Sequence, residues 1–497
     1  MSPTTTTPAA GRQLQPTVLA ATAVLFGVMT SHALLETARD ALFLARLGPD
    51  RLAWAYLAIA GASLVAFVVM RRLLGLRDAR RLLLVLVAIA AVGTSVLAAT
   101  IALSHSLVFG LYVWTGLVAT LVVPCFWTVV DRSLSVDQAK RYFSVIGAGG
   151  IGGALVGSAI ATVLGRLVEP RHLVTAGAVS FTLTAVTAAL LAPKPGTDAP
   201  VARKRADRGA MPRRTYRYIR LLVTTTLVAT VALTLGDLAF KRAIAERLPA
   251  ADLATTFGAI YTGLNILSLA VQLVLAPRIL DRLGVGVAMV ILPSLMLITT
   301  LGFAATAMLG AVLALKLGDG SLRHSLHRVT AEILYLPVAP GIRDGAKPIA
   351  DALGQRGGQI VAVLVVLAAT SIGSLDVGAR FLAIVAAAAT VVWLGLLPLV
   401  RAAYVDQFRA MLVAGGVQRG VRLPRLDASA VELLHGKLAS PDEVEALAAL
   451  ELLAGHHAPL PALVLYHPRP AVVRRALELV GGLARSDVAP AIAHLAG

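Results

Sequence analysis

Long apolar runs dominate this chain and decide which kinds of fold are open to it. A segment of about 20 apolar residues, wound as a helix, crosses the hydrocarbon core of a bilayer, which is about 30 Å thick. The runs here are apolar on all sides and helical in length, which predicts membrane helices and not barrel strands. Twelve such spans can be placed, at residues 17–37, 52–70, 82–103, 106–130, 145–164, 172–192, 219–240, 255–276, 285–307, 309–328, 357–373 and 379–400.

Basic residues are concentrated in particular connections between these spans. The formal net charge is +18, although only 14% of the residues are charged. Residues 71–81 and 194–220, which follow the second and sixth spans, are rich in arginine and lysine, whereas the connections near Ser104 and Gly310 carry almost no charge. The positive-inside rule then places both termini and the even-numbered connections in the cytoplasm. We therefore attribute the excess positive charge to the orientation of the helices in the cell (inner) membrane. For the same reason we expect no nucleic-acid partner.

The sequence carries no motif for a cofactor or for catalysis. Cys125 is the single cysteine, which excludes an intramolecular disulfide and a cysteine zinc cluster. Gly147–Gly152 matches the dinucleotide fingerprint literally, but it opens a predicted membrane helix and follows no strand. Gly149, Gly153 and Gly157 instead predict close packing between two helices. No Walker A, zinc-protease or serine-hydrolase motif is found, so we expect no cofactor and no enzyme activity.

The chain has the pattern of an internal duplication. Lys140, Gly147 and Gly150 recur as Lys347, Gly354 and Gly357, all at an offset of 207 residues. This divides the chain into two six-helix halves, residues 17–192 and 219–400, joined by a basic cytoplasmic linker, 193–218. Two halves repeated in one orientation are the major-facilitator pattern, in which the substrate site lies near the midplane between them. A chance match of glycines and basic residues at helix ends is the alternative.

The last residues, 423–497, differ from the rest because the long apolar runs stop. Ala448–Gly455 (AALELLAG) is similar to Arg475–Gly482 (RALELVGG), and each falls on a stretch with the helical period near 3.6. We interpret this part as a small soluble tail of HEAT-like helical repeats. Two repeats are fewer than such arrays normally need, so the tail is expected to pack on the membrane domain or on a protein partner.

Charged residues inside the predicted spans are candidates for a substrate site, because a charge within a bilayer is costly. Glu36 and Arg39 share one face of the first span, and Asp237 and Lys241 lie one turn apart at the end of the seventh. Lys316, Asp319, Arg323 and His327 form a stripe on the tenth. The alternatives are structural ion pairs or charges at the membrane rim. As substrate-binding residues we predict Arg39, Asp237, Lys241, Arg323, Lys316 and Glu36, with the bases binding an anion and Asp237 as counter-ion or gate.

Part of the second half resembles a known family. Ser325–Val338 (SLHRVTAEILYLPV), followed by Lys347–Asp351 and Gly354–Gly358, is similar to a segment of the ATP/ADP translocases of plastids and obligate intracellular bacteria. The matching positions are Thr330, Glu332, Tyr335, Pro337, Lys347, Asp351, Gly357 and Gly358.

The resemblance extends, in patches, over about residues 20–400. Asp137–Phe143 (DQAKRYF) resembles the family segment after helix four, and Leu35–Leu42 (LETARDAL) resembles its helix-one motif. Asp237 and Lys241 stand at the family's helix-seven acid and base. The family's helix-four glutamate corresponds to Gly116 here, and the lysine of its helix-ten motif corresponds to Ala331.

From this resemblance and the charges we expect a secondary transporter of an anionic solute, similar to nucleotide (ATP/ADP) exchangers. It would work by rocking one half against the other around a site between them. Its partners would be the lipid bilayer, an anionic small molecule and, through residues 423–497, a protein. The alternative is a non-transporting membrane scaffold or sensor, derived from a transporter, that uses the tail to bind its partner.

Overall fold

The computed structural model describes residues 16–76, 78–134, 136–190, 211–372, 376–413, 428–455 and 460–481, and the regular elements in these ranges are helices. The N-terminal half contains α1 (Pro16–Arg46), α2 (Leu52–Leu76), α3 (Ala79–Thr100), α4 (His105–Ser133), α5 (Val136–Leu167) and α6 (Pro170–Leu190). The C-terminal half contains α7 (Arg213–Ala245), α8 (Leu253–Ala270), α9 (Ala276–Thr306), α10 (Leu309–Leu322), α11 (Arg328–Leu334), α12 (Pro340–Ser371) and α13 (Ala379–Val413). The tail contains α14 (Ala428–Leu438), α15 (Glu443–Gly455) and α16 (Pro470–Gly481).

Two π-helical segments join α8 to α9 and α10 to α11, and each forms one longer continuous helix with its neighbours, which we call a rod. Val271–Leu275 connects α8 to α9, and the chain turns back within α9 at Gly284, whose φ of 74° is readily adopted only by glycine. Arg323–His327 connects α10 to α11. In the described part of the chain, eleven helical segments are long and apolar enough to cross a membrane, and the α10–α11 rod accounts for the remaining predicted span. The predicted all-α membrane fold with two six-helix halves is confirmed.

Several helices extend well beyond their predicted spans. α5 begins at Val136 and α12 at Pro340, whereas the apolar runs begin at 145 and 357. A span predicted from hydropathy ends at the first charged residues, but the backbone hydrogen bonds of the helix continue past them. Lys347, which precedes the eleventh predicted span, lies on α12, where its Nζ is 2.7 Å from Asp351 Oδ2 and 3.1 Å from Glu332 Oε1. Ion pairs of this kind stabilise a helix that continues through charged residues, so α12 begins well before the apolar run.

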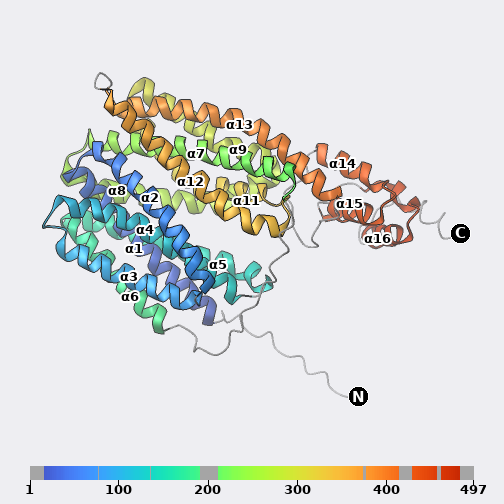
Figure 1. The fold of residues 1–497 in the computed structure, drawn as a ribbon, viewed down its shortest axis with the longest axis horizontal. Helices are drawn as coiled ribbons and strands as arrows, with labels where there is room; N and C mark the ends of the chain where they lie inside the picture. The colour runs from blue at the N-terminus through green and yellow to red at the C-terminus, as the bar shows by residue number, and fades with distance from the viewer. Residues whose placement is uncertain are drawn as a thin grey trace, which may run out of the picture.

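The helices of each half lie side by side, with the N-terminal half (blue to teal) below and the C-terminal half (green to orange) above in Figure 1. We call the end where α6 ends and α7 begins the linker end, and the opposite end, where α1 ends and α2 begins, the distal end. The tail helices α14–α16 lie beyond the linker end, on the right of Figure 1. α5 packs on α8, and α2 packs on α12, so each half contributes helices to the interface.

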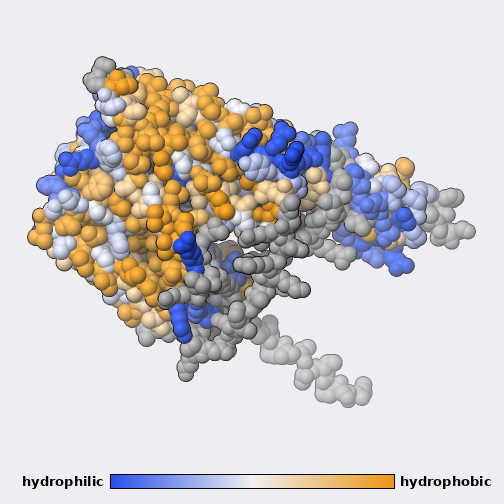
Figure 2. Space-filling model, in the orientation of Figure 1, coloured by the Kyte–Doolittle hydropathy of each residue, from blue (hydrophilic) through white to orange (hydrophobic). Residues whose placement is uncertain are grey.

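The outer surface of the bundle is apolar, as expected for contact with lipid. Figure 2 shows hydrophobic residues covering most of the face in view, with hydrophilic residues gathered toward its ends and on the tail. Val65, Val92 and Ile298 are each about two-thirds exposed. Exposing so many apolar side chains to water would cost free energy, whereas contact with lipid does not.

Glycines bring α5 against α1, as their spacing predicted. A Cβ added at Gly153 would lie 2.1 Å from the carbonyl oxygen of Phe26, and one at Gly157 would lie 2.4 Å from that of Thr30. Both contacts are closer than atoms can approach, so only glycine permits this packing. Thr30 Oγ1 also hydrogen-bonds to the Gly153 carbonyl, at 3.0 Å.

The tail has a small core of its own that continues onto the membrane domain. Leu434, Leu450 and Val472 are buried in it, and Phe408 and Met411 of α13 pack against the same cluster. Through these two residues the tail cluster contacts the end of α13. Its predicted repeats lie on α15 and α16, except for Gly482, which lies outside the described residues.

Candidate functional site

Charged residues from both halves meet near the distal end of the bundle. We call Glu36, Arg39 and Asp40 of α1, Asp237 and Lys241 of α7 and Lys316 of α10 the distal network. Asp40 lies six residues before the end of α1 and Lys241 four before the end of α7. At 1.5 Å per residue these positions are about 6–9 Å from the helix ends.

Lys241 lies at the centre of this network, and its side chain is only 2% exposed. Its Nζ is 3.0 Å from Asp40 Oδ1, in the other half, and 3.3 Å from Asp237 Oδ2, one turn back on its own helix. It also donates to the hydroxyls of Tyr112, at 2.8 Å, and Tyr56, at 3.1 Å. Four oxygen partners compensate for removing the ammonium group from water.

The two central carboxylates are bound from both halves. Asp40 accepts a hydrogen bond from the Tyr261 hydroxyl of α8, at 2.5 Å. Asp237 accepts one from Lys316 Nζ, also at 2.5 Å, and a further hydrogen bond from the Tyr56 hydroxyl of α2. Each carboxylate therefore has a partner in its own half and at least one in the other. The predicted Asp237–Lys241 and Glu36–Arg39 pairs are both present, the latter at 3.3 Å.

Arg39 lies at the edge of the network and is held less tightly. Its Nη1 donates to Thr115 Oγ1, at 3.0 Å, while its buried Nε has no hydrogen bond and is 3.6 Å from Asp40 Oδ1. The guanidinium carbon lies 4.8 Å from the centre of the Tyr112 ring. A stacked, partly bonded arginine of this kind can change partners without a large rearrangement.

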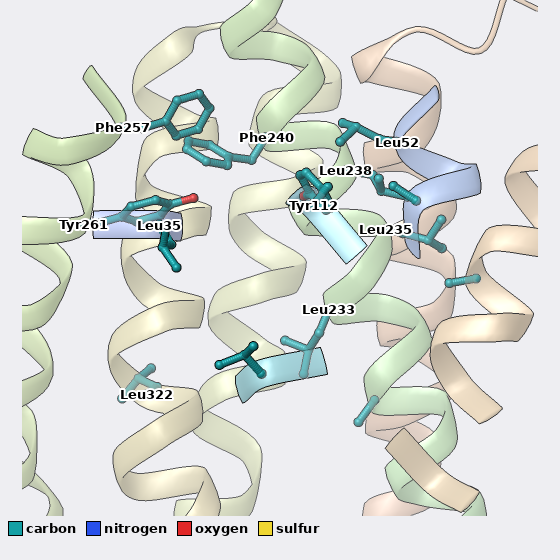
Figure 3. Packing of buried hydrophobic residues seen from close by; sticks show 14 of the residues in the cluster. Leu35, Leu52, Tyr112, Leu233, Leu235, Leu238, Phe240, Phe257, Tyr261 and Leu322 are labelled. Carbon is teal, nitrogen blue, oxygen red and sulfur yellow. The ribbon is translucent and has the colours of Figure 1, made fainter. Parts of the chain in front are cut away.

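Apolar and aromatic side chains enclose the network. Figure 3 shows Tyr112 of the N-terminal half and Tyr261, Phe240 and Phe257 of the C-terminal half in the same part of the core. Phe240, Phe257 and Leu35 are fully buried. Such a dry surrounding strengthens each ion pair relative to water.

The charges of the network balance, but they do not balance within each half. Arg39, Lys241 and Lys316 are the three bases, and Glu36, Asp40 and Asp237 are the three acids. The α1 residues carry two acids and one base, whereas those on α7 and α10 carry two bases and one acid. The halves therefore attract each other at this end.

Arg323 lies outside the distal network, although the sequence suggested it beside the other five residues. It is seven residues beyond Lys316 on the same rod, and it forms a bidentate pair with Asp319, at 2.7 and 2.8 Å. Asp319 is buried on α10, whereas Arg323 is partly exposed and is the first residue of the π-helical segment. Among the residues the structure describes, no group of His, Cys, Asp and Glu is arranged to hold a metal ion.

The sequence predictions missed several members of the site. Asp40 is fully buried at its centre, and Tyr56, Tyr112 and Tyr261 bind its charges. Asp40 directly follows Arg39 and was a visible intramembrane charge. No such signal marked the tyrosines in the sequence, because a tyrosine within an apolar run is also an ordinary residue of a hydrophobic core.

A polar pair also joins the halves at the middle of the bundle. Arg356 Nη2 of α12 donates to Thr120 Oγ1 of α4, at 2.7 Å, and its Nη1 donates to Gln359 Oε1, at 2.8 Å. A groove of about 560 Å³ lies between α9 and α13, lined by residues such as Met289, Leu394 and Arg401. Its lining includes neither Arg356 and Thr120 nor any residue of the distal network.

Solved structures of other proteins share the fold of this chain. No protein-family model matches the chain, and no curated protein matches it significantly in sequence. The crystal structure of nucleoside transporter NupG has a TM-score of 0.58 at 12% identity, covering 79% of this chain and 99% of that one, and a mutant of it scores 0.58 at 14%, covering 78% and 99%. A bacterial homologue of the iron transporter ferroportin, in an inward-facing state, has a TM-score of 0.53 at 14% identity, covering 80% and 100%.

The chain has a major-facilitator-like fold. These neighbours are covered almost completely, while about a fifth of this chain has no counterpart in them. At identities this low the likeness concerns the fold alone, and the site must be argued from its own residues.

Proposed function

We propose that this protein is a secondary transporter of an anionic solute that works by alternating access, with nucleotides as the first candidates. The observation that carries the proposal is the distal network, which joins two major-facilitator-like halves through the buried Lys241–Asp40 ion pair and through tyrosine hydrogen bonds. The resemblance of Ser325–Val338 to ATP/ADP translocases and the fold it shares with a nucleoside transporter support the choice of candidates.

In this proposal the distal network is a gate. Opening the distal end separates α1, α2 and α4 from α7, α8 and α10, which breaks the bonds from Lys241 to Asp40, Tyr56 and Tyr112 and from Tyr261 to Asp40. Lys241 and Lys316 then remain beside a single acid, Asp237. An anionic substrate offers this half a replacement for Asp40, and it thereby lowers the cost of opening.

The direct test is uptake of labelled ATP, ADP and phosphate into proteoliposomes. The proposal expects uptake of at least one anion, accelerated by the same anion inside the vesicles if the protein is an exchanger. A neutral variant of Lys241, such as Lys241→Met, should reduce uptake at least tenfold. The lack of any uptake beside an active control transporter would remove the nucleotide and phosphate candidates.

A second candidate function is a membrane scaffold that binds a protein through its tail. The observation in its favour is that α14–α16 form a core of their own beyond the bundle while Leu463 and Tyr466 remain exposed. A scaffold requires the tail and tolerates loss of the gate charges. A transporter has the opposite requirement, so the Lys241→Met variant and a tail deletion distinguish the two.

A further inference from the structure

Arg356 differs in its partners from the four bases described above. Lys241, Lys316, Arg39 and Arg323 each have a carboxylate within 4.0 Å. Arg356 bonds instead to two neutral oxygens, those of Thr120 and Gln359. No carboxylate that the structure describes forms an ion pair with it.

The position of Arg356 makes this pairing costly. It lies 16 residues after the start of α12 and 15 before its end, which is about 24 and about 22 Å along the helix. Thr120 is equally central in α4, 15 residues after His105 and 13 before Ser133. A guanidinium group at this depth needs a counter-charge, because hydrogen bonds to neutral groups compensate for only part of the lost hydration.

The surroundings of Arg356 combine polar groups from both halves. Thr120 lies 3.4 Å from the buried Ser63 hydroxyl of α2, while Gln359 extends the polar surface along α12. Gly354 and Gly358, on the opposite face of the same helix, pack against Thr226 and Leu227 of α7. Arg356 therefore points away from its own half and toward the N-terminal half, and its side chain remains only half-buried.

We propose that Arg356, with Thr120 and Gln359, binds a negatively charged group of the substrate, a phosphate or a carboxylate, between the two halves. This deepens the proposed transport function and rests on it. The guanidinium fork matches both groups through paired N–H donors, and two of its five donors already hold it in position. The distal network cannot supply this counter-charge, because its three acids are matched by its own three bases.

The site also spans the interface on which alternating access depends. Thr120 belongs to the N-terminal half and Arg356 to the C-terminal half, and Thr120 lies eight residues beyond Tyr112 on α4, about 12 Å toward the linker end. An anion bound here contacts both halves below the closed gate. The substrate group thus occupies the middle of the pathway, whereas the distal network closes one end of it.

The experiment compares charged and neutral probes on the purified full-length protein. Thermal unfolding in detergent is followed with increasing AMP, inorganic phosphate or succinate, and with adenosine as the uncharged twin of AMP. A ligand that binds the folded state raises its unfolding temperature, which yields an apparent Kd. We expect at least one anion to bind the wild type, and Arg356→Gln to weaken that binding at least tenfold while leaving any adenosine binding unchanged.

Two further variants control for general effects. Arg356→Lys keeps the charge but loses the fork, so it should weaken binding less than Arg356→Gln. Arg380→Gln removes an arginine that hydrogen-bonds to the Ala304 carbonyl near the distal end of α13, and this variant should bind the anion like the wild type. The unfolding temperatures without ligand show whether each variant is folded.

The outcomes separate this inference from the proposed function. Unchanged anion binding in a folded Arg356→Gln variant, or no stabilisation of the wild type by any of the three anions, overturns the anion site. Uptake of an anion by proteoliposomes that carry this variant at the wild-type rate also overturns it, yet leaves the transporter intact. Arg356-dependent binding without uptake of any bound anion would instead refute transport and keep the site.

Discussion

At the scale of single residues, we expect the largest loss of stability from substitution of the buried Lys241. Lys241→Met leaves Asp40 and Asp237 with one partner fewer in a dry interior, and breaking a buried ion pair in this way costs about 3–5 kcal/mol. We expect a clear fall in unfolding temperature. Arg242→Gln is the matched control, because Arg242 pairs with Asp50 and Glu246 at the exposed helix end, where such pairs contribute about 1 kcal/mol or less. Equal effects of the two variants would contradict the assigned burial.

A second residue-scale prediction concerns the glycines of α5. Gly153→Ala places a methyl group on the Phe26 carbonyl, so α1 and α5 must separate, and overpacking of this kind costs about 1–3 kcal/mol. Gly147→Ala, on the same helix, meets nothing within 4 Å and should be neutral or stabilising by up to about 1 kcal/mol. The unfolding temperatures of both variants provide the check. A destabilised Gly147→Ala with an unaffected Gly153→Ala would reverse the packing we describe.

At the scale of elements, the contact of α5 with α8 can be used to test whether the distal end opens during transport. Thr162 Oγ1 and Thr262 Oγ1 are 3.3 Å apart across the two halves, and Gly258 lets the backbones approach closely. Cysteines at both positions should therefore form a disulfide on oxidation. If the distal end must open during transport, this bond stops uptake, and a reductant restores it.

The controls for this cross-link follow from the native cysteine content. The single variant Thr162→Cys should keep its uptake under oxidation, because Cys125 is fully buried and offers no partner. Full uptake by the oxidised double variant, with the cross-link shown by a mobility shift, would mean that the distal end does not open.

At the scale of the whole molecule, the tail is a separate unit attached to the last membrane helix. Removing residues 414–497 exposes Phe408 and Met411 but leaves the distal network and Arg356 in place. We expect proteoliposome uptake to stay at half of the wild-type rate or more, with a modest loss of stability. A folded truncated protein that takes up nothing would favour a role of the tail in function.

The sequence alone was enough for the membrane helices, their division into two halves and the glycine contacts. Each of these depends on local composition, because a bilayer requires about 20 apolar residues per crossing wherever the segment lies. Charges were visible as candidates for the same reason, since they interrupt apolar runs. Helix starts such as Pro340 were misjudged where ion pairs extend a helix through polar residues.

Only the tertiary structure decided which of the charges inside the bundle form ion pairs. Lys241 and Asp40 are 201 residues apart, and Arg356 and Thr120 are 236 apart, so their contacts depend on how two separately folded halves face each other. Five of the six predicted site residues lie in a network at one end whose charges balance, and Arg323 pairs with Asp319 outside it. Arg356, which the sequence predictions did not include, lies at the middle. The long apolar runs determined where helices could lie. The packing between the halves decided whether a charge inside the bundle meets a carboxylate, as Lys241 does, or neutral oxygens, as Arg356 does.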